Sequence, residues 1–63
     1  MNPLYPLPGE IYRHVKTGGR YMVICMALEE APGTPVVVYR DIEKGGTWTR
    51  PAREFLDGRF EKL

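Results

Sequence analysis

The chain has 63 residues, so it forms one domain at most. Nine Lys and Arg residues against eight Asp and Glu residues give a net charge of +1, which does not favour nucleic-acid binding through a concentrated basic face. A single cysteine excludes an internal disulfide, and one cysteine with one histidine is too few for a structural zinc site without several carboxylates. No apolar run is long enough to span a membrane and the N-terminus lacks the pattern of a secretion signal, so we expect a cytoplasmic protein without a membrane partner.

The first nine residues, MNPLYPLPG, predict an extended arm because their prolines fix φ and remove amide donors. Leu4, Tyr5 and Leu7 are apolar enough to pack against another surface. That surface is either the core of the same domain or a second subunit.

Residues 10–16 predict a first strand whose faces alternate. The two faces carry Ile11, Arg13 and Val15 on one side, and Tyr12, His14 and Lys16 on the other. After a turn at Gly18 and Gly19, the apolar residues 20–28 predict a central strand covered on both faces. Simple alternation assigns these faces as Tyr21, Val23, Cys25 and Ala27, and Met22, Ile24, Met26 and Leu28.

A loop over residues 29–35 precedes a third strand over residues 36–42, which three consecutive valines predict. Residues 47–50 predict a short fourth strand with Trp48 and Arg50 on one face.

A helical turn is predicted to begin at Pro51 and to end at Gly58. Ala52, Phe55 and Leu56 would lie on one side of it. A last short strand over residues 59–63 would then place Phe60 inward.

Four to five short strands with tight turns, plus one short C-terminal helical turn, predict a mainly β fold. Partial closure would hide the exposed edges of so small a sheet, so we expect an SH3-like, partly open barrel. The chain is expected to be a single domain over residues 1–63, with an arm over residues 1–9 and a β domain over residues 10–63.

Four blocks of the sequence follow one another in an order seen in a known family. These blocks are GEIYRHVK, YMVICMALEE, VVVYRDI and TWTRPAREFLD. Over roughly residues 9–57 they resemble the small bacterial and phage family called domain of unknown function 1653. The resemblance implies a small β-rich domain and no established activity. Where members of this family carry a polar His-Ser-Glu stretch after the second strand, this chain has LEEAPGTP.

The residue types give little support to catalysis. The sequence contains no serine and none of the motifs of serine hydrolases, P-loop NTPases or zinc proteases. Cys25 lies mid-strand among apolar neighbours, where a thiol is normally buried and inert. A hydrolytic pair of His14 and Glu10 gains little from a domain that encloses so little volume. We therefore expect a protein that is not an enzyme and uses no cofactor.

Aromatic and basic side chains instead indicate a binding function. The candidate ligand-binding residues are Tyr12, Arg13, His14, Lys16, Tyr39, Arg40, Trp48 and Arg50. Arginine forks bind carboxylate or phosphate oxygens two at a time, and Tyr and Trp rings stack on flat groups. The set suits an anionic, partly aromatic ligand such as a nucleotide. It equally suits an acidic peptide with an aromatic anchor, or single-stranded nucleic acid.

Each of these residues also has a purely structural interpretation. Trp48 is more often a core or core-edge ring, Tyr12 and Tyr39 are more often half-buried strand residues, and His14 is more often an ordinary surface residue. The arginines could pair within the chain: Arg13, Arg40 and Arg50 with Asp41, Glu54 or Asp57.

Chain size favours self-association. The apolar surface that such a chain buries contributes about 90–100 kcal/mol, and ordering the chain costs about 95 kcal/mol, so the two nearly cancel. A filled barrel of this length is also not expected to enclose a ligand volume of roughly 300–1,000 Å³. A ligand pocket would then have to form between subunits.

Our leading hypothesis is a homo-oligomeric, non-catalytic binding protein for a nucleotide or a nucleotide-derived signal. The partly viral distribution of the family adds the idea that a phage protein of this kind sequesters a host immune signal. An alternative is an adaptor that holds an acidic or aromatic segment of a partner such as a host protein. A third hypothesis is weak binding of single-stranded nucleic acid within a larger complex.

Overall fold

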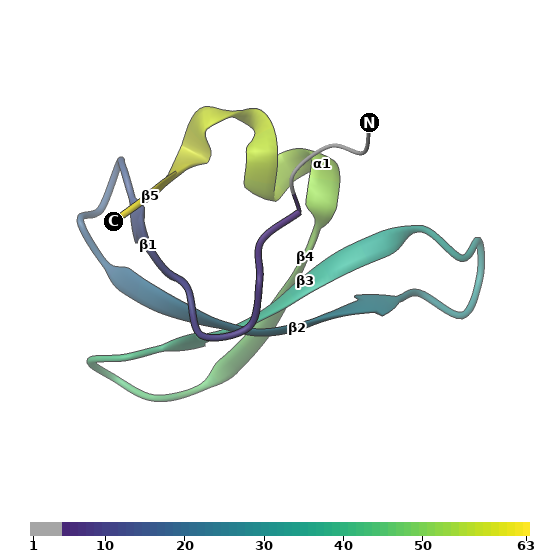
Figure 1. Cartoon of the computed structure of the whole chain (residues 1–63), viewed down its shortest axis with the longest axis horizontal. Coiled ribbons are helices and arrows are strands. Elements are labelled where there is room, and N and C mark those ends of the chain that lie inside the picture. Colours follow the sequence, from purple (N-terminus) through teal and green to yellow (C-terminus); the bar gives the residue numbers. More distant parts are fainter. Residues whose placement is uncertain (1–4) are drawn as a thin grey trace.

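The structure is a computed structural model, and it describes residues 5–63. Within these residues, antiparallel strands form a five-stranded sheet in the order β4-β3-β2-β1-β5 (Figure 1). The strands are β1 (Ile11–His14), β2 (Arg20–Leu28), β3 (Pro35–Asp41), β4 (Thr47–Pro51) and β5 (Phe60–Lys62). Between β4 and β5 lie a helical turn, α1 (Ala52–Glu54), and a wider π-type turn, η1 (Phe55–Arg59).

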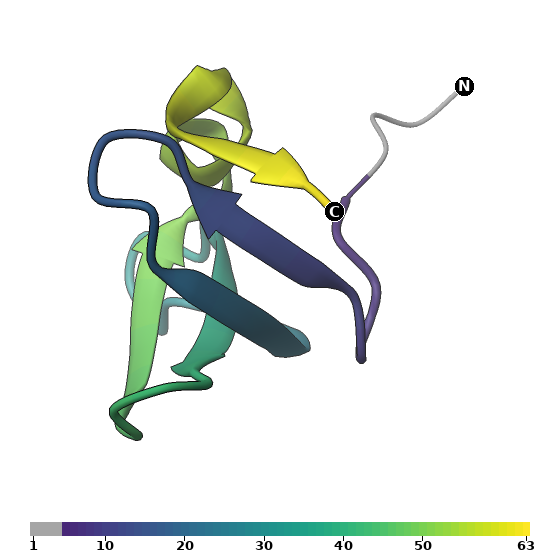
Figure 2. The same ribbon diagram turned by 90° about the vertical axis from the view of Figure 1, so that its left-hand side faces the viewer.

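The sheet curls round a core and stays open between its edge strands. Within the described residues β4 pairs with β3 and β5 pairs with β1, and the edges β4 and β5 do not pair with each other. α1 and η1, together called the helical segment, connect the end of β4 to the start of β5 across the open side of the sheet (Figure 2). The predicted class is confirmed: the fold is mainly β, with short strands, partial closure and one short C-terminal helical segment.

Aromatic rings fill much of the core. The buried cluster consists of Tyr12, Val23, Val37, Tyr39, Ala52, Phe55 and Phe60. Phe55 from η1 stacks on Phe60 from β5 with ring centroids 4.2 Å apart, and Tyr12 meets the Phe55 ring edge-on at 5.0 Å. Large rings each bury much apolar area, so a few of them suffice to close the core of a small domain.

β2 departs from simple alternation because it contains a β-bulge. Its register with β3 shifts between Val23 and Cys25. The bulge adds one residue to β2, so the side chains after it point to the faces opposite to those that simple alternation predicts. Met26 therefore packs against the core on the same side as Val23, whereas Cys25 is exposed. The predicted faces beyond Val23, and the expectation of a buried Cys25, are therefore wrong.

β2 is a central strand, as predicted, but it is not covered on both faces. The Ile24 and Leu28 side chains are exposed. The apolar run correctly indicated a strand with a neighbour on each side. It did not indicate that one face is exposed, because residues 5–63 form no second layer over this part of the sheet.

The described part of the N-terminal arm docks on its own domain. Pro6 is fully buried, whereas Tyr5 and Leu7 are exposed and Leu4 lies outside the described residues. Two backbone hydrogen bonds join the end of the arm to β2: Gly9 N to Val23 O at 2.8 Å, and Val23 N to Glu10 O at 2.9 Å. Within residues 5–9, Pro6 rather than Tyr5 or Leu7 is the buried side chain, and docking on a second subunit stays a prediction for the exposed Tyr5 and Leu7.

The C-terminal segment follows its predicted course. Gly58 has φ 106°, a left-handed conformation that glycine adopts readily, and it turns the chain from η1 towards β5. Ala52, Phe55 and Phe60 are buried, as predicted, whereas Leu56 is exposed.

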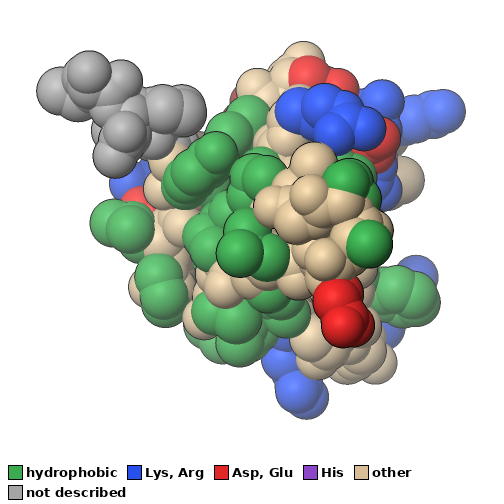
Figure 3. Space-filling view, turned by 90° about the vertical axis from the view of Figure 1, so that its right-hand side faces the viewer, with side chains coloured by type: hydrophobic (Ala, Val, Ile, Leu, Met, Phe, Trp, Pro, Cys, Tyr) green, Lys and Arg blue, Asp and Glu red, His purple; other side chains and the backbone are tan. Residues whose placement is uncertain are grey.

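An apolar depression lies on the surface beside Tyr5 of the N-terminal arm. This depression of about 280 Å³ is lined by Tyr5, Thr34, Pro35, Ala52, Arg53 and Leu56. Figure 3 shows hydrophobic side chains gathered on the side of the molecule from which the β2–β3 hairpin projects.

Acid is expected to destabilise the domain through Glu10. The Leu7 amide donates to the Glu10 carboxylate at 2.9 Å and Lys62 Nζ lies 3.2 Å from it; the Leu7 hydrogen bond is the main cause that lowers the pKa of Glu10. The stabilisation is therefore complete above the unfolded-state pKa of about 4.3, and it is lost as the pH falls through the lower folded-state value. The urea concentration at the unfolding midpoint should decrease as the pH is lowered from about 5 to about 2. This decrease should be smaller in Glu10→Gln than in the unaltered protein. Glu30→Gln, an exposed loop variant, is the control, and an unchanged pH dependence in Glu10→Gln would contradict this account.

Candidate functional site

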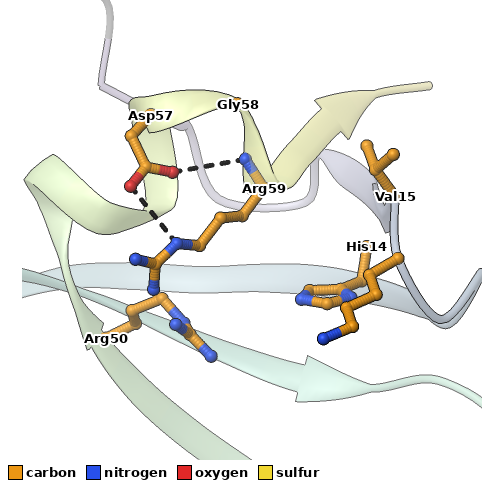
Figure 4. Close-up of a pocket in the computed structure, with 7 residues that line it drawn as sticks. His14, Val15, Arg50, Asp57, Gly58 and Arg59 are labelled. Carbon is orange, nitrogen blue, oxygen red and sulfur yellow. Dashed lines mark hydrogen bonds and ion pairs between the residues drawn. The ribbon is translucent and has the colours of Figure 1, made fainter.

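A basic groove lies between the loop that follows β1 and the turn that precedes β5. Its volume is about 640 Å³, and it is lined by His14, Val15, Lys16, Arg50, Asp57, Gly58 and Arg59 (Figure 4). A smaller space of about 260 Å³, here called the aromatic hollow, adjoins the basic groove because His14 and Arg50 line both. The other residues of the aromatic hollow are Thr17, Tyr21, Tyr39, Trp48, Thr49 and Phe60.

Arg50 is held at the boundary between the two spaces. Its Nε donates to the Tyr39 hydroxyl at 3.3 Å, its Nη1 lies 3.6 Å from Glu54 Oε1, and its guanidinium carbon lies 5.6 Å from the centre of the Phe60 ring. The hydrogen bond that Arg50 donates to Tyr39 is the main cause that raises the pKa of Arg50 above its usual value. These contacts orient the guanidinium before any ligand arrives, which reduces the entropy lost on binding.

Arg59 provides a second guanidinium, and it is not among the eight binding residues predicted from the sequence. Its Nε lies 3.2 Å from Asp57 Oδ2 and its Nη1 lies 3.4 Å from Glu54 Oε1. Figure 4 shows the side chains of Arg59 and Arg50 approaching each other from η1 and from β4. The sequence feature that could have indicated this position is Gly58, which directly precedes Arg59. A glycine in the left-handed conformation reverses the chain direction at the end of a helix, so the next residue lies back beside the helical turn.

His14 and Lys16 form the opposite wall of the basic groove. The Thr17 amide donates to His14 Nδ1 at 3.3 Å, and Thr17 Oγ1 lies 3.1 Å from the same nitrogen. A neutral His14 ring that accepts at Nδ1 carries its proton on Nε2. The ring also packs edge-on against Phe60 at 4.9 Å, so the imidazole is fixed in orientation.

Trp48 stands at the rim of the aromatic hollow with 57% of its surface exposed. A Cβ at Gly46 would lie 3.3 Å from Trp48 Nε1, so the indole lies against the backbone of the β3–β4 turn. The interpretation of Trp48 as a core ring is wrong, because its place on β4 lies beyond the part of the sheet that the helical segment covers. An exposed ring of this kind can stack on a flat ligand.

Residues 10–61 match the family described as Protein of unknown function (DUF1653). The chain belongs to this family. The resemblance noted in the sequence is thereby confirmed, and the DUF1653 match includes every residue of the groove and the hollow. Comparisons with curated proteins and with solved structures give no match. Within residues 5–63, no helix of this DUF1653 domain is long and apolar enough to cross a membrane.

The DUF1653 fold brings together five of the eight predicted binding residues. The groove and the hollow contain His14, Lys16, Tyr39, Trp48 and Arg50. Alternation along β4 places Trp48 and Arg50 on one face, and the curl of the sheet turns this face towards His14 at the end of β1 and Lys16 in the loop that follows.

Three predicted binding residues lie elsewhere. Tyr12 is a buried core ring whose hydroxyl donates to Glu10 at 3.1 Å, and burial is the main cause that raises the pKa of Tyr12. Arg13 points to the other face of β1, where its Nε lies 2.9 Å from a carboxylate oxygen of Glu61 in β5. Arg40 is exposed and lines neither space, since it follows Tyr39 directly and therefore lies on the opposite face of β3.

The basic groove is open to solvent along one side. Its volume of about 640 Å³ lies within one chain because the sheet does not close between β4 and β5, so concave surface remains beside the filled core. An enclosed pocket completed by a second subunit stays a prediction.

Proposed function

We propose that this DUF1653 protein is a non-catalytic binding protein for a small anionic ligand with a planar group, such as a nucleotide or a nucleotide-derived signal. The observation that carries the proposal is the position of Arg50. Its side chain lines both the basic groove and the aromatic hollow, so one guanidinium can hold an anionic group while a flat group lies beside it.

The basic groove suits the anionic part of such a ligand. Lys16, Arg50 and Arg59 reach it from three different segments of the chain. Guanidinium forks and an ammonium are the groups that bind carboxylate and phosphate oxygens in proteins.

The aromatic hollow suits the planar part. The exposed Trp48 indole offers a stacking surface, and Tyr39 and Phe60 form apolar walls. The hydroxyls of Thr17 and Thr49 supply hydrogen-bonding groups for the polar edge of a base.

Binding without turnover is favoured by how the polar groups are engaged. Asp57 is the carboxylate that lines the basic groove, and both of its oxygens contact Arg59, one at the backbone amide and one at Nε. His14 is held by Thr17, and Cys25 lines neither space. Among the described residues that line the site, the Thr17 hydroxyl lies 3.1 Å from His14 Nδ1, but that nitrogen also accepts the Thr17 amide, so it is not a free base.

Self-association remains part of the proposal. Tightly held small ligands lose roughly 70–90% of their surface to protein, and the basic groove leaves one side of a ligand in solvent. A second copy placed over the groove would supply the missing wall. In a phage, such an assembly would act by sequestering a host signal.

Native mass spectrometry of the purified protein, followed by a thermal-shift screen, tests this function. The probes are AMP, ATP, cyclic dinucleotides, inorganic phosphate and an acidic peptide with one aromatic residue. A nucleotide present at about 100 times its Kd should stabilise the protein by about 2.7 kcal/mol and raise the Tm by about 10 °C or more.

A protein that is stabilised by the acidic peptide and by no nucleotide would support the adaptor alternative. In that case the apolar depression lined by Tyr5, Pro35 and Leu56 is the surface to mutate first. Binding of an oligonucleotide that weakens steeply with salt would instead support the nucleic-acid alternative.

A further inference from the structure

The charges around the basic groove nearly cancel. Three cationic side chains reach it, namely Lys16, Arg50 and Arg59. Two carboxylates contact the guanidiniums: Glu54 Oε1 lies 3.6 Å from Arg50 Nη1 and 3.4 Å from Arg59 Nη1, and Asp57 Oδ2 lies 3.2 Å from Arg59 Nε. With His14 neutral, the sum of these charges is +1.

The aromatic hollow does not change this sum. Apart from Arg50 and His14, which line both spaces, the described residues that line the hollow carry no charge at neutral pH. The carboxylates also occupy some of the guanidinium N–H donors, so fewer remain for a ligand.

We propose that the site selects ligands with one negative charge on a planar scaffold, such as a phosphodiester or a single carboxylate, over phosphomonoesters and polyphosphates. The inference rests on the proposed function and defines the charge class of its ligand. One anionic group is balanced by the net charge of the groove. Each further negative charge lies close to the carboxylates of Glu54 and Asp57, and we expect their repulsion to cost about three- to tenfold in affinity, the Coulomb energy of unit charges some 6 Å apart at an effective dielectric constant of about 40–80.

The decisive comparison uses AMP and its 5′-phosphate methyl ester, because the two share every group except one ionisable oxygen. Binding is measured by calorimetry at about pH 8, where histidine side chains are generally neutral. The methyl ester should bind about three- to tenfold more tightly than AMP, and ATP should bind more weakly than AMP. Equal or tighter binding of AMP would overturn the charge selection while leaving the binding function intact.

Benzoate and phenyl phosphate form a second pair, with a simpler ring and one and two negative charges respectively. They are expected to rank in the same order. If neither pair binds at any concentration tested, the proposed function fails, and the charge selection fails with it.

Glu54→Gln tests the cause of the selection. It removes the carboxylate that both guanidiniums contact and raises the groove charge to +2. AMP should then bind about three- to tenfold more tightly than it binds the unaltered protein, with a smaller gain for the methyl ester. Glu61→Gln is the matched control: it changes the charge of the chain equally, but Glu61 pairs with Arg13 and lines neither space.

An unchanged preference in Glu54→Gln would overturn the inference. Asp57→Asn is a second variant with the same charge change, in case Glu54→Gln does not fold. The circular dichroism spectrum and the Tm of each variant establish that it is folded before binding is measured.

Discussion

Phe55→Ala is expected to lower the free energy of unfolding by about 3–5 kcal/mol, the usual cost of removing a fully buried aromatic ring. Phe55 is 1% exposed, and its ring contacts Phe60, Tyr12 and Tyr39 with centroid distances of 4.2, 5.0 and 5.3 Å. A domain of this length has a total stability of about 3–9 kcal/mol. The loss is a large part of this total, so the urea midpoint of the variant, measured by circular dichroism, should be far below that of the unaltered protein.

Leu56→Ala is the matched control for Phe55→Ala. Leu56 is the next residue along η1 and is 40% exposed, so the same truncation should cost about 1 kcal/mol or less. A Phe55→Ala protein with the same urea midpoint as Leu56→Ala would show that the core is not organised round this ring.

Arg50→Ala is expected to weaken binding of the anionic ligand roughly 10- to 100-fold, since a hydrogen bond to a charged group contributes about 1.5–3 kcal/mol. Arg50→Lys should recover only part of this loss, because lysine keeps the charge but not the planar fork. Calorimetry with the tightest ligand from the nucleotide screen measures both effects. Arg40→Ala is the control, since Arg40 is an exposed arginine one strand away that lines neither space.

The fold should survive the loss of Arg50. Its side chain is 29% exposed, and its hydrogen bond to Tyr39 contributes about 0.5–1.5 kcal/mol. If Arg50→Ala unfolds, Arg50 is structural. If Arg40→Ala weakens binding as much as Arg50→Ala does, the ligand binds outside the groove.

The connection between fold and site lies in the open side of the sheet. β4 carries Trp48 and Arg50, β1 and its loop carry His14 and Lys16, and η1 carries Arg59. Closing the barrel by pairing β4 with β5 would remove the space between these segments. The features that leave it unclosed, namely the helical segment and the left-handed Gly58, are therefore also the features that create the site.

The order and type of the elements could be predicted from the sequence because they depend on local signals. Alternation places Tyr12 and His14 on the inward face of β1, and three valines mark β3. Gly58 ends the helical segment because its φ is one that other residues rarely adopt. Each of these signals acts within a few residues of its own position, and family membership followed from the same local blocks.

The site depended on contacts between distant segments, so only the tertiary structure decided it. A bulge after Val23 reverses the facing of the second half of β2, which exposes Cys25, and no local pattern marks its position. Arg59 lines the basic groove with Arg50 because η1 brings the chain back to the sheet. Arg40 does not line the groove because the face of β3 that carries it points away from the core. By itself the sequence determined which residue types are present and how each strand alternates. Strand pairing and sheet curvature decide which strand faces meet across the groove. Both depend on contacts between residues that are far apart along the chain.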